Sequence, residues 1–131
     1  MVHDGSYMRE VSASISAAAV MILCTVTGSI CTCTITKHSA SASSYQGEIL
    51  GAIITQLILR AAVTGKIGPF PIMTEDCNNN GVVLHSNSPF RTLSSTQTQA
   101  NVLRIMKRLI SGQPFAINFL YVTSHSNDKK D

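Results

Sequence analysis

Four of the seven acidic side chains fall at the ends of segments with the pattern of a strand or a helix. Asp4 ends the first strand-like segment, Glu48 opens the first long helical pattern, Asp76 lies near the end of a later strand, and Asp128 follows the last one. Mg²⁺ prefers oxygen ligands, and two such ions about 4 Å apart can activate a water and stabilise the leaving oxygen of a phosphodiester. A lone Glu at a helix start is more often a favourable partner of the helix dipole. A metal site therefore requires that the fold bring these carboxylates together.

The elements that would position them begin with three strand-like segments, at residues 1–6, 17–26 and 30–36. Thr27-Gly28 between the second and third is typical of a tight turn, because glycine supplies the positive φ that a two-residue hairpin needs. We therefore predict a hairpin centred on Thr27-Gly28.

That hairpin would place Cys24 opposite Cys31, within disulfide range, although a reducing compartment would keep both as thiols. The Cys31-Thr32-Cys33 spacing suits alternating strand positions better than a zinc site. The uncharged stretch 11–36 is also long enough to span a membrane. Its Ser and Thr content and its β-branched alternation favour strands instead, so we expect no membrane partner and an intracellular protein, cytoplasmic or nuclear.

A helical period replaces the strand pattern after the linker at 39–44. Apolar residues at 49, 50, 53, 54, 57, 58 and 61 form one helical stripe. The segments expected after it are a strand at 72–77, a short helix through 82–84, a loop at 86–95, a helix at 98–111, a strand at 115–122 and a polar tail at 124–131. This order, β-β-β-α-β-α-α-β, predicts a single α/β domain over residues 1–131, with a mixed sheet flanked by helices.

Three stretches give the sequence a family likeness: His3-Asp4-Gly5-Ser6, the segment SYQGEILGA at 44–52, and Tyr121-Val122-Thr123-Ser124-His125. Together with the element order, they resemble the ribonuclease H family, including the ribonuclease H domains of retroelement reverse transcriptases. The resemblance implies a five-stranded mixed sheet whose first three strands are antiparallel. The family's final helix, which carries its last Asp, is missing or barely begun, so the domain is expected to be truncated.

The resemblance also implies a site and an activity. Asp4, Glu48, an acid of the fourth strand and Asp128 would bind two Mg²⁺ ions, with Mn²⁺ as a substitute, and His125 would assist proton handling or product release. The implied reaction is endonucleolytic cleavage of the RNA strand of an RNA–DNA hybrid, beside a neighbouring reverse-transcriptase domain in the parent chain.

The sequence departs from the family pattern at the end of the fourth strand. Asn78 stands where the family has an Asp, and Asp76 lies two residues earlier on the same face of the strand. Either Asp76 serves through a shifted register or the site has lost one charge. We favour Asn78 at the ligand position, with weaker metal binding and reduced activity, because an amide oxygen does not neutralise the ion.

The charge of the chain is compatible with nucleic-acid binding, and other functions than an active nuclease also stay open. The net charge of +3 permits a nucleic-acid partner without arguing for one. Arg104, Lys107 and Arg108 could face phosphates from one side of the helix at 98–111, or could be a solvated helix face. The alternatives to an active nuclease are a catalytically inactive nucleic-acid-binding or scaffolding domain of a retroelement polyprotein, and a domain of the same fold with different chemistry.

Overall fold

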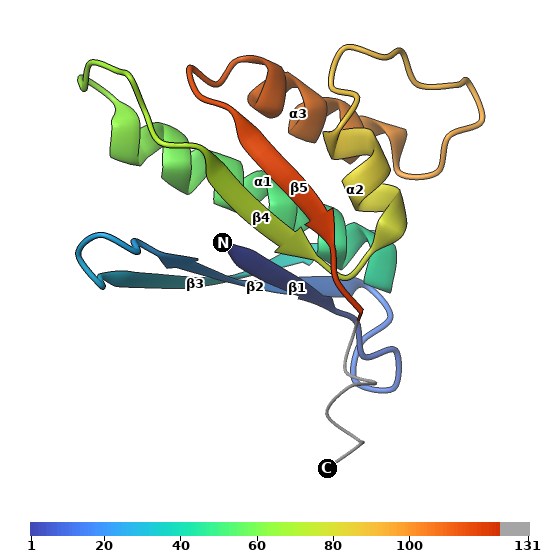
Figure 1. The fold of residues 1–131 in the computed structure, drawn as a ribbon. Coiled ribbons are helices and arrows are strands. Elements are labelled where there is room, and N and C mark those ends of the chain that lie inside the picture. Colours follow the sequence, from blue (N-terminus) through green and yellow to red (C-terminus); the bar gives the residue numbers. More distant parts are fainter. Residues whose placement is uncertain (124–131) are drawn as a thin grey trace.

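The structure is a computed structural model that describes residues 1–123 (Figure 1). Its elements follow the order predicted from the sequence, β-β-β-α-β-α-α-β. They are β1 Val2–Ser6, β2 Ile15–Leu23, β3 Ile30–His38, α1 Ser44–Val63, β4 Met73–Cys77, α2 Asn80–Ser86, α3 Ala100–Ser111 and β5 Ile117–Tyr121.

The strands form one five-stranded sheet in the order β3-β2-β1-β4-β5. β1 pairs antiparallel with β2, and β2 antiparallel with β3, which confirms the predicted antiparallel arrangement of the first three strands. β1 then pairs in parallel with β4, and β4 with β5. β1 therefore lies at the centre of the sheet. One of its neighbours is β2, the next strand along the chain, and the other is β4, which comes only after β3 and α1.

The predicted hairpin is present, but its turn is longer than two residues. β2 and β3 pair from Ile15 opposite His38 to Leu23 opposite Ile30, which leaves residues 24–29 as the connection. Gly28 has a φ of 75°, as the turn requires. The strands found over residues 15–23 and 30–38 show that a helical span across 11–36 would have been wrong.

The position of the turn corrects the predicted cysteine pair. The amide of Cys24 donates to the Ser29 carbonyl at 2.9 Å, so Cys24 lies opposite Ser29. Cys31 lies opposite Ile22 instead. All four cysteines are free thiols. The turn is centred between Val26 and Thr27 instead of between Thr27 and Gly28, so the register of the two strands differs from the predicted one.

The helix α1 is the largest element of the core. Ser43 caps its N-terminus by accepting a hydrogen bond from the Gln46 amide at 3.0 Å. The helix packs against β1, β2 and α3. Its length and mean hydropathy of 1.2 would also suit a membrane span, but 61% of its most apolar window is buried within this domain, as in the core helix of a soluble protein. The length and composition of α1 are therefore weak evidence for a membrane span.

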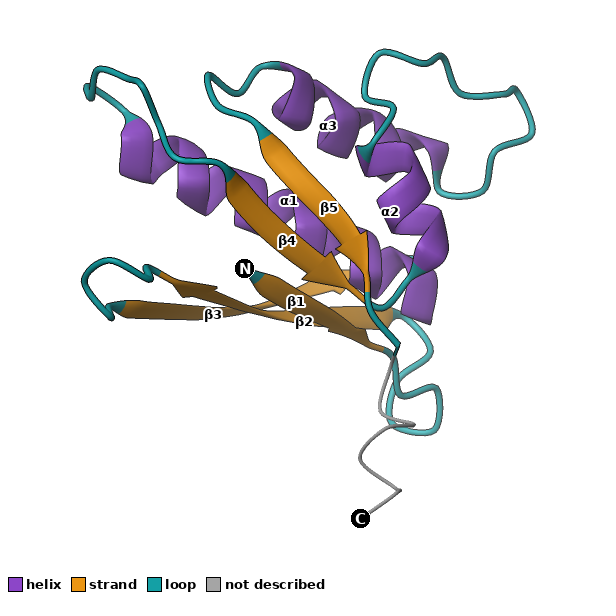
Figure 2. Cartoon of the chain, viewed as in Figure 1, coloured by secondary structure: helices purple, strands orange, loops and turns teal. Residues whose placement is uncertain are grey.

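The helices pack on one face of the sheet; Figures 1 and 2 show α1 passing behind β4 and β5, with α3 above β5. Strand residues that face them are buried, as His3, Glu75 and Cys77 are, whereas their neighbours Asp4 and Asp76 on the other face are half-buried. The apolar core between the layers consists of Ile49, Ala52, Ile53, Cys77, Val82, Val83, Val102, Leu103 and Met106.

Candidate metal centre

The first turn of α1 touches β1 because glycine occupies both sides of the contact. A Cβ on Gly5 would lie 2.3 Å from the Glu48 nitrogen and 2.5 Å from the Gly47 carbonyl carbon. A Cβ on Gly47 would lie 2.8 Å from the Ala17 carbonyl oxygen. The absence of both methyl groups lets the Gly5 amide donate to Glu48 Oε1 at 2.9 Å. Backbone contact thus fixes the Glu48 carboxylate at the end of β1.

Asn78 completes a cluster with Asp4 and Glu48, directly after β4. In one orientation the Asn78 amide nitrogen donates to Asp4 Oδ1 at 3.4 Å. In the flipped orientation it lies 3.3 Å from each of the two Glu48 carboxylate oxygens. The amide therefore lies between the two carboxylates in either orientation, and β1, α1 and the residue that follows β4 each contribute one oxygen-bearing side chain to the same place.

The carboxylates of Asp4 and Glu48 repel each other in this cluster, and Glu48 is also partly removed from water. Burial raises the pKa of Glu48, and the neighbouring Asp4 carboxylate raises it further, while the hydrogen bond from the Gly5 amide acts in the opposite direction. A divalent cation between the two carboxylates would relieve this repulsion. Two carboxylates and an amide oxygen form a hard donor set that suits Mg²⁺ or Mn²⁺. They supply two negative charges, so the described residues fit one such ion better than two.

Asp76 lies farther from the cluster than Asn78 does. In the β1–β4 register it is opposite Val2, and its amide donates to the Met1 carbonyl at 2.8 Å. It shares a face of the sheet with Asp4 but lies one strand repeat, roughly 6–7 Å, before Asn78. The structure therefore brings Asn78, and not Asp76, into contact with Asp4 and Glu48. His125 and Asp128, the remaining expected site residues, lie outside the described residues.

The three basic residues of α3 differ in their surroundings. Arg104 and Arg108 are exposed. Lys107 is only 5% exposed, and its ammonium donates to the carbonyls of Ser88 and His85 at the end of α2. Burial lowers the pKa of Lys107, and Arg91 adds to the effect. Lys107 thus acts as a cap of α2, and the expectation that it faces phosphates alongside Arg104 and Arg108 is corrected.

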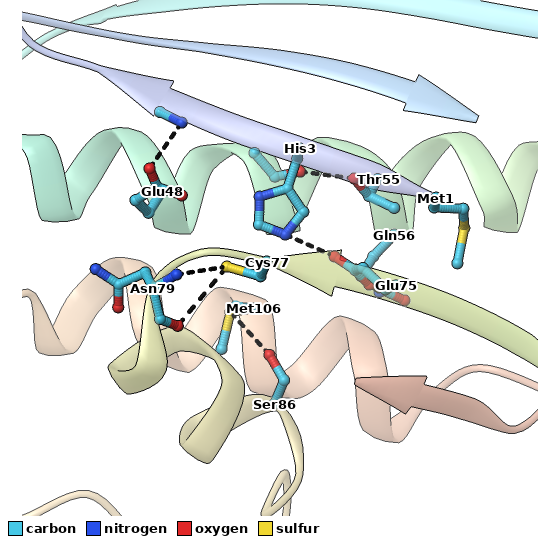
Figure 3. A network of polar contacts seen from close by, with 12 residues as sticks. Met1, His3, Glu48, Thr55, Gln56, Glu75, Cys77, Asn79, Ser86 and Met106 are labelled. Carbon is cyan, nitrogen blue, oxygen red and sulfur yellow. Dashed lines mark hydrogen bonds and ion pairs between the residues drawn. The ribbon is translucent and has the colours of Figure 1, made fainter. Parts of the chain in front are cut away.

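Sequence reasoning missed a buried polar network on the inner face of the sheet (Figure 3). His3 Nε2 lies 2.9 Å from Glu75 Oε1, and Gln56 donates to Glu75 Oε2 at 2.9 Å. Gln113 donates in turn to Gln56 Oε1 at 3.0 Å. Burial alone would lower the pKa of His3, but hydrogen bonding to Cys77 and the Glu75 carboxylate outweigh it and raise the pKa to about 10.

One signal in the sequence could have indicated this network. Gly47 and Gly51 are four residues apart in the helical segment, so they lie on one helix face, and the absence of a Cβ at both lets a neighbour approach that face closely. A Cβ on Gly51 would lie 2.7 Å from His3 Nδ1, so the glycine makes room for the imidazole. The period-two pattern also places His3, Glu75 and Cys77 on the inner face once β1 and β4 are paired.

Comparisons with known proteins identify the fold. No protein-family model matches the sequence, and no curated protein matches it significantly. Among solved structures, the chain is similar to RNase H1 from the halophilic archaeon Halobacterium salinarum NRC-1, with a TM-score of 0.67 and 14% identity over 97% of this chain and 86% of that one.

Two further structures agree with it. The N-terminal RNase H domain of rv2228c from Mycobacterium tuberculosis, solved as a fusion with maltose binding protein, gives a TM-score of 0.66 at 10% identity, covering 98% of this chain and 85% of that one. LC11-RNase H1 in complex with an RNA/DNA hybrid gives 0.64 at 11% identity, covering 98% and 87%. The chain therefore has a ribonuclease H-like fold, as predicted.

Proposed function

We propose that this domain binds RNA–DNA hybrids and cleaves their RNA strand in a reaction that depends on Mg²⁺ or Mn²⁺. The observation that carries the proposal is the meeting of Asp4, Glu48 and Asn78 where β1, α1 and β4 come together. One of the proteins of similar fold, LC11-RNase H1, was solved with such a hybrid. In the setting that we propose, the domain lies beside a reverse-transcriptase domain of a retroelement protein.

The residues of the cluster have different roles toward a bound ion. When bound, a divalent ion would activate a water and stabilise charge on the scissile phosphate. Asp4 and Glu48 hold such an ion through full negative charges, and the Gly5 amide keeps the Glu48 carboxylate oriented. Asn78 can offer its amide oxygen but no charge. The site of this chain should therefore be attenuated, because divalent ions require several full negative charges around them.

The test is cleavage of a labelled hybrid in Mg²⁺ and, separately, in Mn²⁺. Asn78→Asp should strengthen Mg²⁺ binding and raise kcat/KM by about tenfold or more, which corresponds to only ~1.4 kcal/mol of transition-state stabilisation. Asp4→Asn should abolish cleavage. Asp76→Asn is the matched control, since it removes a carboxylate two residues before Asn78 in the sequence, and should change the rate little.

Two other outcomes have definite meanings. If Asp76→Asn abolishes cleavage and Asn78→Asp changes little, Asp76 is the ligand and the assignment of Asn78 is wrong. If the original protein and all three variants remain folded and bind the hybrid without cutting it, the domain is a catalytically inactive nucleic-acid-binding module. Binding without cleavage is the second candidate function, which the neutral Asn78 favours.

A further inference from the structure

Directly behind the candidate metal centre, on the inner face of the sheet, three donor groups of different chemistry lie together. One ligand atom each of His3, Glu48 and Cys77 lies within 4.8 Å of the other two, and all three side chains are buried. They come from β1, α1 and β4, and Figure 3 shows the His3 imidazole between Glu48 and Glu75 with the Cys77 sulfur close by. The proposed nuclease site uses only Glu48 of the three.

His3 is arranged as metal-binding histidines are. Its Nε2 is held by Glu75 at 2.9 Å, while its Nδ1 is buried and, among residues 1–123, the imidazole has no polar side-chain partner besides Glu75 and Cys77. A histidine that ligates a metal through one nitrogen usually bonds a carboxylate through the other, which fixes the ring. Gln56 fixes that carboxylate from its far side at 2.9 Å. Because Gly51 has no side chain, the imidazole can pack directly against α1, where a Cβ would lie 2.7 Å from Nδ1.

The donor set discriminates between metals. One nitrogen, one sulfur and one carboxylate oxygen suit Zn²⁺ or another borderline-soft ion, whereas Mg²⁺ avoids thiolate. Bonds of about 2.0 Å to N and O and about 2.3 Å to S, in tetrahedral geometry, separate the ligand atoms by roughly 3.2–3.8 Å. The three donors lie within 4.8 Å of one another, so the longest separation must close by about 1–1.6 Å when the ion binds.

We propose that His3 Nδ1, Cys77 Sγ and a Glu48 carboxylate oxygen bind Zn²⁺ or a similar thiophilic divalent cation. Binding releases the protons of the Cys77 thiol and of Nδ1 to solvent, and the second Glu48 oxygen or a water takes the fourth position. Because Glu48 also contacts the Asp4 and Asn78 cluster, a cation on the inner face draws this carboxylate away from it. Zn²⁺ on the inner face and Mg²⁺ on the outer site therefore compete.

The test is a titration of the reduced, metal-free protein with Co²⁺, followed by displacement with Zn²⁺ in the presence of a competing chelator. A near-ultraviolet thiolate-to-cobalt absorption band should appear in the original protein. Cys77→Ser should remove the band and weaken Zn²⁺ binding by at least tenfold. Cys31→Ser, which changes an exposed cysteine of β3, is the matched control and should leave both unchanged.

The proposal is overturned if the band persists in Cys77→Ser, or if this variant binds Zn²⁺ as tightly as the original protein. If circular dichroism shows that Cys77→Ser is unfolded, His3→Gln replaces it and should weaken Zn²⁺ binding by the same factor. Both measurements are independent of hybrid cleavage. A protein that binds Co²⁺ through Cys77 but cuts no hybrid would refute the proposed function alone.

Discussion

Replacing Gly5 by alanine tests how closely α1 must approach β1. The added Cβ would lie 2.3 Å from the Glu48 nitrogen and 2.5 Å from the Gly47 carbonyl carbon, whereas non-bonded heavy atoms are normally about 3.5 Å apart. Both obstructing atoms are backbone atoms of a helix, so no side-chain rotation can relieve the clash. The start of α1 must therefore retreat from β1 by about 1 Å.

Two costs follow from that retreat. Overpacking of this kind typically costs about 1–3 kcal/mol. The hydrogen bond from the Gly5 amide to the Glu48 carboxylate, 2.9 Å long, is also lost, and bonds to charged groups contribute about 1.5–3 kcal/mol. We therefore expect Gly5→Ala to lower the free energy of unfolding by about 2.5–6 kcal/mol, a large fraction of the ~5–15 kcal/mol of an ordinary domain.

Urea unfolding followed by far-ultraviolet circular dichroism measures this difference. Gly28→Ala is the control, because a Cβ at Gly28 meets nothing within 4 Å and only the φ of 75° opposes it, at a cost of about 1–2 kcal/mol. Equal destabilisation by the two substitutions would refute the argument that close approach, and not glycine's backbone freedom, is what Gly5 provides. The Mg²⁺ affinity of folded Gly5→Ala should also fall, because Glu48 moves with the helix.

Three other predictions concern charged groups. The pKa of His3 in the folded state, about 10, lies above its unfolded value of 6.5, so its contacts with Cys77 and Glu75 stabilise the fold fully below pH 6.5, and this stabilisation is lost as the pH rises toward 10. Urea melts should show a decline of several kcal/mol across that window, at ~1.4 kcal/mol per unit, and a profile as flat as that of His3→Gln would contradict it. Lys107→Met keeps the apolar stem but removes the ammonium bonds to α2, and thermal unfolding should show a loss of about 1–3 kcal/mol; the exposed Arg104→Met should change stability by less than ~0.5 kcal/mol. If Arg104 and Arg108 contact phosphates, replacing either by a neutral residue should reduce by about one the slope of the logarithm of the hybrid-binding constant against the logarithm of the salt concentration. An unchanged slope would exclude that contact.

The order of the elements was predictable because each carried a local periodic signal. The apolar stripe over residues 49–61 and the alternation of the strands reflect burial of one face, which depends on near neighbours in the sequence. The length of the hairpin turn was not predictable in the same way. Thr27-Gly28 indicated that a turn was present, but the hydrogen bonds across residues 24–29 decide where pairing ends.

The candidate site was predictable only in part, because its geometry comes from pairing between distant strands. The sequence indicated Asp4 and Glu48, but it could not decide between Asp76 and Asn78, which depends on how far β4 runs past β1. Lys107 was misjudged because it stands at the edge of the apolar stripe of α3. A long side chain at such a position can bury its stem and still reach polar partners.

The parallel pairing of β1 with β4 also determines when the cluster can form during folding. The hairpin closes a connection of six residues between Leu23 and Ile30, whereas contact between Asp4 and Asn78 spans 74 residues. The entropy of loop closure makes the longer contact about 2 kcal/mol less favourable and slower to form. During synthesis, β1, β2, β3 and α1 can assemble before β4 has emerged, which brings Asp4 and Glu48 together without Asn78. The complete donor set therefore forms only late in folding. A chain arrested before β4 would hold the carboxylates of Asp4 and Glu48 close together without the Asn78 amide.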